Sequence, residues 1–151
     1  MYAYQDPAAR MTLGEGLEEY YASIPGLINE RDASSPEAAA LFHGHDRCHV
    51  VFGCDTSYVG ESMVDTWTLF GSDVGTRRYL AYARTPEVKA IFRDIGRARS
   101  AWIFIASSPR LLRVIARARA MTQKWPFDRA DEHLDRPLDE LRAELGIRII
   151  T

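Results

Sequence analysis

Residues 35–61 read SPEAAALFHGHDRCHVVFGCDTSYVGE and predict two helices joined by a tight turn. The serine and proline at the start of this stretch favour a helix N-terminus, as cap and first-turn residue. Gly53 stands where helices commonly end, and residues 54–57 have the composition of a turn, with Thr56 or Ser57 as the cap of the next helix. We therefore expect the two helices to form an antiparallel hairpin.

Two histidines, His45 and His49, lie four positions apart on the first of these helices. Residues at this spacing share one helix face, roughly 6 Å apart, within reach of one small cation. The pair falls inside the apolar stripe of the helix, so both rings are expected to point inward. The stripe consists of Ala38, Leu41, Phe42 and Phe52. Buried imidazoles need partners for their nitrogens, and a metal ion with a carboxylate supplies them.

Glu61, on the second helix, is expected to lie level with His49. At about 1.5 Å of rise per residue, both lie roughly 6 Å from the turn, one on each side of it. Asp46, at the edge of the histidine face, is interpreted either as a fourth ligand or as a group that fixes a histidine tautomer. The predicted metal ligands are His45, Asp46, His49 and Glu61. Because they offer only nitrogen and oxygen, the predicted ion is zinc, with iron(II) as the alternative.

A purely structural interpretation of the same residues stays open. The two histidines can be core residues that bond to the backbone or to Asp46, and Glu61, which lies off the apolar stripe of its helix, can be a solvated acid. Gly60 marks either an imperfection of that helix or a close backbone approach. Four ligand-type residues at this spacing favour the metal site.

The run HDRCH at 45–49, followed after eleven residues by Glu61, resembles the His-Asp-x-x-His…Glu signature of the ubiquinone (coenzyme Q) biosynthesis family numbered four, the Coq-four proteins. The segment PLDELRAELGI at 137–147 is similar to the closing element of that family. The resemblance covers residues 35–147. Typical members carry a longer N-terminal helical region, so the resemblance is to a shortened form.

The resemblance implies a metal-dependent enzyme of ubiquinone biosynthesis, a lyase that removes the C1 carboxyl group from the ring of a prenylated hydroxybenzoate. It also implies a prenylated aromatic or isoprenoid lipid as partner, a biosynthetic complex or homo-oligomer, and a place in the cytoplasm or at the inner face of the membrane. Two other functions stay open. One is a lipid-binding or organising subunit with a structural metal, and the other is a non-haem metal oxygenase or hydrolase acting on another apolar molecule.

The composition predicts one globular domain over residues 1–151, because 46% of the residues are hydrophobic and 26% are charged. A net charge of -2 argues against a general nucleic-acid binder. The longest strongly apolar stretch, 101–106, is short, and no basic segment opens the chain, so neither a spanning helix nor a secretion signal is expected. Cys48 and Cys54 are interpreted as reduced thiols in the cytoplasm.

Helical periodicity along the rest of the chain predicts an all-α, compact bundle of about six helices. Besides the hairpin, whose second helix ends near Gly71, the expected helices cover 12–24, 86–106, 109–124 and 137–145. The run Ser107-Ser108-Pro109 is expected to separate two of them, and Gly96 is a candidate kink.

Arg110, Arg113 and Arg117 share one face of the helix expected at 109–124. They are interpreted either as a site for an anionic head group, on a membrane phospholipid or on a substrate, or as a solvated helix face. Aromatic residues and methionines at helical spacing are interpreted as core. Because the family resemblance implies a prenylated ring, a ligand channel between helices is the alternative.

Overall fold

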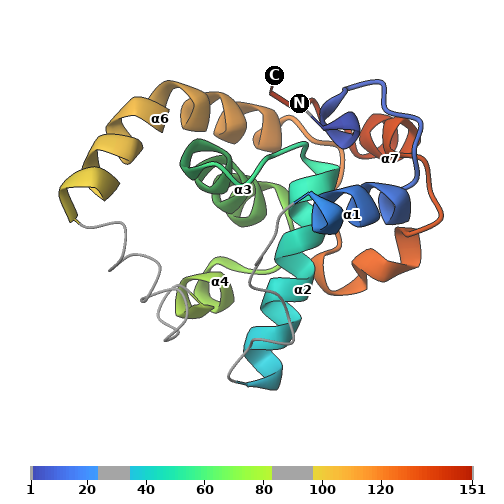
Figure 1. Cartoon of the computed structure of the whole chain (residues 1–151), viewed down its shortest axis with the longest axis horizontal. Helices are drawn as coiled ribbons and strands as arrows, with labels where there is room; N and C mark the ends of the chain where they lie inside the picture. The colour runs from blue at the N-terminus through green and yellow to red at the C-terminus, as the bar shows by residue number, and fades with distance from the viewer. Residues whose placement is uncertain (1, 24–34, 83–96, 151) are drawn as a thin grey trace.

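The structure of the chain is a computed structural model that describes residues 2–23, 35–82 and 97–150. For residues 82 and 97–106 it describes the backbone. Every regular element in this part of the chain is a helix (Figure 1). Two isolated bridges, Thr12 to Pro137 and Ser72 to Trp125, supplement the helices. The predicted all-α fold is therefore confirmed.

Helix α2 (Pro36–Val51) is the central element, and Figure 1 shows it crossing the molecule between α1 and α3. Its neighbours are α1 (Leu13–Ala22), α3 (Tyr58–Gly71), α4 (Thr76–Tyr82), α7 (Leu138–Leu145) and the short helices η1 (Ala3–Gln5) and η3 (Phe127–His133). Because helices surround it, the residues from Gly44 to Val51 are all buried, polar ones included. Any polar group on this part of α2 must therefore find its partner inside the protein.

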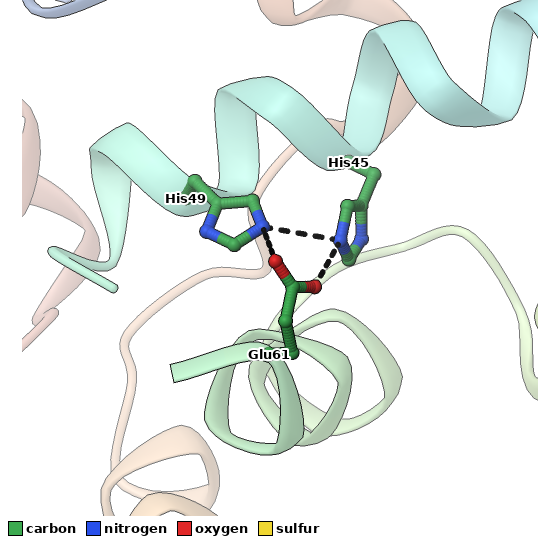
Figure 2. A group of neighbouring side chains, drawn as sticks. All are labelled: His45, His49 and Glu61. Atoms are coloured by element: carbon green, nitrogen blue, oxygen red, sulfur yellow. Dashed lines mark hydrogen bonds and ion pairs between the residues drawn. The ribbon is translucent and has the colours of Figure 1, made fainter. Parts of the chain in front are cut away.

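Helices α2 and α3 follow one another through the predicted tight turn, and their ends are where the cap residues indicated. The expected antiparallel arrangement was wrong, since Figure 2 shows α2 lengthwise and α3 nearly end-on. Helix α3 packs instead along α6. The Ser35 hydroxyl accepts a hydrogen bond from a backbone N–H of α2, and the Ser57 hydroxyl accepts one from the N–H of Gly60. Gly53 follows the end of α2 with a φ of 67°. This left-handed conformation favours glycine. A Cβ there would also lie 2.9 Å from Ile149, so both the backbone and the packing select glycine.

Helix α6 (Arg97–Arg119) packs along α3 at the outside of the bundle (Figure 1). The helix continues through Pro109, so the predicted break at this proline was wrong. Val114 and Ala118 are buried in the core. The free energy gained from burying these side chains offsets the cost of the backbone hydrogen bond that a proline removes from a helix interior. Residues 86–96 of the helix expected at 86–106, with the candidate kink at Gly96, lie outside the described residues.

Three short helices, η1, α4 and η3, were not predicted. None has more than seven residues, which is too short for a hydrophobic period to stand out. Two of them bring polar side chains to the central helix. Helix α4 places Tyr79 beside His45, and η3 supplies Asp131, whose carboxylate binds Arg47 of α2.

Arg142 of α7 joins both ends of the chain to the central helix. Its guanidinium is buried and donates hydrogen bonds to the carbonyl oxygens of Tyr4, Asp6, Val50 and Val51. The last two belong to the final turn of α2, where carbonyls lack partners within the helix. A cation at a helix C-terminus is also favoured by the helix dipole.

Two further features concern the cysteines and the helices that could cross a membrane. Cys48 and Cys54 are free thiols, and both are buried. Within the described ranges, no helix combines the length and the apolar character that crossing a bilayer requires.

Candidate metal centre

His45 and His49 of α2 and Glu61 of α3 converge on one point between the two helices (Figure 2). The Nε2 atoms of the two rings are 3.2 Å apart. One carboxylate oxygen of Glu61 lies 3.4 Å from Nε2 of His45, and the other lies 3.4 Å from Nε2 of His49. Folding of α2 and α3 about the turn therefore brings Glu61 to the histidine pair, as predicted. With one ligand atom from each residue all within 4.8 Å of one another, this group can bind a metal ion.

The group has a closed side and an open side. The His49 side chain is 1% exposed and the His45 side chain 10% exposed, whereas 40% of the Glu61 side chain reaches solvent. The imidazoles therefore form the floor of the site, inside the protein. The carboxylate lies on the side of the site that solvent reaches.

The hydrogen bonding of His49 leaves a nitrogen lone pair in the site. Nδ1 of His49 lies 3.2 Å from the carbonyl oxygen of Cys54, and this oxygen can only accept, so Nδ1 carries the hydrogen. In the neutral ring, Nε2 then points its lone pair at the Glu61 carboxylate. Two acceptors that face each other repel, and a cation between them removes the repulsion. A proton or a metal ion fills this role.

The pKa values of His45 and Glu61 also indicate that the site favours a positive charge. Burial by itself lowers the pKa of His45, but the hydrogen bond and charge of Glu61, with the charges of Asp65 and Asp46, outweigh it and raise this pKa to about 9. Burial alone would raise the pKa of Glu61, but the charge of His49 and hydrogen bonds from both histidines bring it well below its ordinary value. Without metal, a proton on His45 therefore neutralises Glu61.

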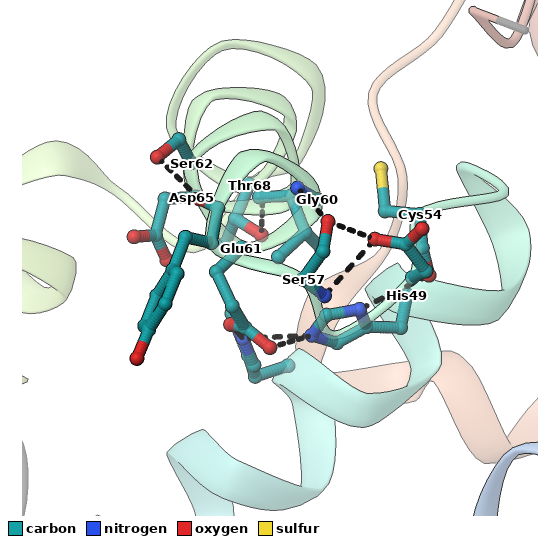
Figure 3. A network of polar contacts seen from close by, with 12 residues as sticks. His49, Cys54, Ser57, Gly60, Glu61, Ser62, Asp65 and Thr68 are labelled. Atoms are coloured by element: carbon teal, nitrogen blue, oxygen red, sulfur yellow. Dashed lines mark hydrogen bonds and ion pairs between the residues drawn. The ribbon is translucent and has the colours of Figure 1, made fainter. Parts of the chain in front are cut away.

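Gly60 determines where Glu61 stands. A Cβ at Gly60 would come within 2.1 Å of Oδ1 of Asp55 and within 2.2 Å of its carbonyl oxygen, so this glycine marks a close backbone approach and not a helix imperfection. The same Asp55 carboxylate accepts hydrogen bonds from the N–H and the hydroxyl of Ser57. Figure 3 shows Ser57 and Gly60 at the start of α3, with Glu61 pointing from the same turn to His49. The tight turn thus positions the carboxylate.

Asp46 is not part of the three-residue group. Its carboxylate accepts a hydrogen bond of 2.9 Å from the hydroxyl of Tyr21, on α1. Asp46 is buried, and this burial raises the pKa of its carboxyl group. The contact ties α1 to α2. In this structure Asp46 thus does not join the other three predicted ligands.

Sequence reasoning missed three groups around the histidines. The Tyr79 hydroxyl lies 3.1 Å from Nδ1 of His45 and donates a hydrogen bond of 2.6 Å to Asp65. The ring of Tyr20 stacks on His49 with centroids 5.1 Å apart. Asp65 carried a signal, since it follows Glu61 by one helical turn. Tyr79 carried none, because α4 itself was not predicted.

The three arginines of the predicted head-group site differ in their surroundings. Arg110 and Arg113 are exposed on α6. Arg117 is half-buried and donates hydrogen bonds to the carbonyl oxygens of Arg148 and Ile149. Arg117 therefore holds the C-terminal segment against α6. The head-group interpretation stays a prediction, carried by the two exposed arginines.

Comparisons with protein families, with curated proteins and with solved structures found no match to this chain. The group formed by His45, His49 and Glu61 can hold a metal ion.

Proposed function

We propose that this protein binds a divalent metal ion through His45, His49 and Glu61 and removes the C1 carboxyl group from a prenylated hydroxybenzoate, a step of ubiquinone biosynthesis. One observation carries the proposal. The motif that resembles the Coq-four signature folds into a group of three converging ligands with one open side. The proposed ion is zinc, with iron(II) as the alternative, because two histidines and one carboxylate suit both.

The geometry favours a catalytic ion over a structural one. Structural zinc sites are usually closed by four protein ligands, whereas catalytic sites have three and leave a position for water or substrate. Three described residues converge here, and the Glu61 side is exposed. A substrate oxygen therefore has a place to bind.

The proposed reaction breaks the bond between C1 of the ring and its carboxyl carbon. Carbon dioxide leaves, the electron pair of the broken bond stays on the ring carbon, and a proton takes the place of the carboxyl group. The ion, when bound, would supply positive charge to a substrate oxygen and so stabilise charge that develops on the ring. His45 and His49 hold their nitrogens toward the site from the buried side, and Glu61 offers its carboxylate from the side that solvent reaches.

Metal analysis of protein purified without chelators tests the metal site. We expect zinc or iron in the natural protein and none in the double variant His45→Ala/His49→Ala. Release of labelled carbon dioxide from a prenylated 4-hydroxybenzoate, labelled at its carboxyl carbon, tests the reaction. Equal metal content in the two proteins would remove the basis of the proposal.

A structural metal in an organising or lipid-binding subunit is the second candidate, because the ligands join two helices and an ion there would clamp them together. The variant Glu61→Ala separates the two functions. A clamp predicts a large fall of the melting temperature, whereas a catalytic ion predicts lost turnover with the melting temperature nearly kept. Metal binding without carbon dioxide release would point instead to an oxygenase or hydrolase acting on another apolar molecule.

The proposal includes a prenylated lipid as partner and work at the inner face of a membrane, alone or within a biosynthetic complex. Arg110 and Arg113 are the candidates for contact with an anionic head group, since both are exposed on α6. Sedimentation with vesicles of anionic phospholipid measures this contact. Loss of binding in the variant Arg110→Ala/Arg113→Ala would support it.

A further inference from the structure

We infer that Asp65 and Tyr79 are positioning residues that select which nitrogen of His45 binds the metal. The inference rests on the proposed function, since it concerns the same site. It assigns a role to two side chains outside the predicted ligand set. They come from two different helices, α3 and α4, and meet at the Tyr79 hydroxyl, which lies next to the ring of His45.

The Tyr79 hydroxyl has a single hydrogen to donate. Tyr79 donates it to Oδ1 of Asp65 over 2.6 Å, so only lone pairs of its oxygen remain for His45. Nδ1 of His45, 3.1 Å from this oxygen, must then be the donor. Because a neutral imidazole carries one N–H, its Nε2 is left with a free lone pair directed at Glu61 and His49.

His49 is held in the same way by the backbone. Its Nδ1 donates to the carbonyl oxygen of Cys54, which also accepts a hydrogen bond from the Tyr4 hydroxyl. A carbonyl oxygen accepts whatever its surroundings, so the orientation of His49 needs no further group. The Tyr79 hydroxyl can either donate or accept, and the contact with Asp65 makes it an acceptor. The selection at His45 therefore depends on two side chains.

Burial makes this contact hard for water to replace. Tyr79 is 4% exposed and His45 is 8% exposed. The two rings lie nearly parallel, with centroids 6.4 Å apart. A phenylalanine at position 79 would keep the ring but leave Nδ1–H without its acceptor inside the protein. Partners of this kind, behind the ligands, typically change metal affinity about 10- to 100-fold.

Zinc titration against a chromophoric chelator tests the inference in the full-length protein. We expect Tyr79→Phe to bind zinc about 10- to 100-fold more weakly than the natural protein. We expect a smaller loss for Asp65→Asn, whose amide oxygen can still accept from Tyr79. Tyr2→Phe removes a phenol hydroxyl next to η1, outside the site, and should bind zinc as the natural protein does. Melting temperatures show whether each variant is folded.

Nitrogen-15 NMR of the zinc-loaded protein adds a readout that a change in stability would not produce. Two imidazole Nδ1–H signals are expected, and Tyr79→Phe should shift the one from His45 and leave the one from His49 in place. If natural protein binds zinc and Tyr79→Phe changes neither affinity nor the His45 signal, the inference is wrong and the proposed function stands. Equal losses in Tyr79→Phe and Tyr2→Phe would also overturn it. If the natural protein binds no zinc, the proposed function fails and the inference fails with it.

Discussion

The ring of His45 touches a carboxylate on one edge and a phenol on the other, and this setting makes the metal-free protein sensitive to pH. Glu61 accepts from Nε2, and the Tyr79 oxygen lies next to Nδ1. The protonated ring donates at both nitrogens. A metal ion would replace only the Nε2 proton and leave the Tyr79 contact unchanged.

The first prediction concerns pH and follows from His45 and Glu61. The raised pKa of His45 means that its protonation stabilises the fold fully below the unfolded value of 6.5, and that this contribution is lost as pH rises through about 9. The lowered pKa of Glu61 contributes stability above its ordinary value of 4.5, which is lost at more acidic pH. The melting temperature of chelator-treated protein should therefore fall between about pH 6 and about pH 10. His45→Gln should lack this fall, and an identical pH profile in both proteins would contradict the assignment.

Gly60→Ala should disturb the turn that leads into α3. The added methyl would meet the carbonyl oxygen of Asp55, which is backbone and cannot turn aside. We expect a net loss of about 1 to 3 kcal/mol in the free energy of unfolding, as for other overpacked sites, and weaker zinc binding because Glu61 is displaced. Urea unfolding and zinc titration measure the two effects.

Ser62→Ala is the matched control for Gly60→Ala. Within the described part of the chain its hydroxyl bonds to the carbonyl oxygen of Tyr58 in the same helix, so its removal should leave both measurements nearly unchanged. Full stability and full zinc affinity in Gly60→Ala would show that the turn does not position the carboxylate.

Among the elements, α6 differs most from the sequence-based prediction. Its continuity through Pro109 depends on packing along α3, which a pattern of residues within α6 does not report. The proline side chain is exposed, so it contributes little to that packing. The residue is therefore a local defect in a helix that its neighbours hold together.

Pro109→Ala should accordingly stabilise the protein. The substitution restores a backbone N–H donor within the helix and replaces a helix breaker by the best helix former, a gain of up to about 3 kcal/mol. Urea unfolding with tryptophan fluorescence measures the change. A variant less stable than the natural protein would mean that the proline ring has a packing role.

For the whole molecule, Arg142 is the residue that joins distant parts of the chain. One guanidinium holds η1, the segment after it and the end of α2 to α7. We expect Arg142→Ala to remove the donor to the buried carbonyls of Tyr4 and Val51, and to cost about 3 kcal/mol or more in the free energy of unfolding. The carbonyls of Asp6 and Val50 keep backbone N–H donors, from Ala9 and Gly53. Thermal unfolding followed by circular dichroism measures it.

Arg136→Ala serves as control for Arg142→Ala because it removes an arginine from the segment just before α7. Arg136 forms a surface ion pair with Glu144, and such pairs contribute about 0 to 1 kcal/mol. Similar losses in the two variants would show that the buried contacts of Arg142 are not special.

The local parts of the fold and site could be predicted because they depend on residues close in sequence. The spacing of His45 and His49 fixes their common face by helix geometry alone. Ser57 caps α3 through an N–H three residues away, and Gly53 ends α2 through its own backbone conformation. Because the turn between α2 and α3 is short, Glu61 in the first turn of α3 lies near the end of α2 that carries the histidines.

Contacts between residues far apart in sequence were decided only by the tertiary structure. Tyr79 reaches His45 across 34 positions, from a helix too short to show a period. Asp46 bonds to Tyr21, a partner that only the packing of α1 against α2 supplies. By itself, the sequence therefore determined α1, α2, α3 and α7 and the placement of the two histidines and Glu61 near one another, through short-range backbone geometry. Packing of α1, α3 and α4 around α2 decided which polar groups surround those ligands, because it brings together side chains whose separation in the chain carries no signal.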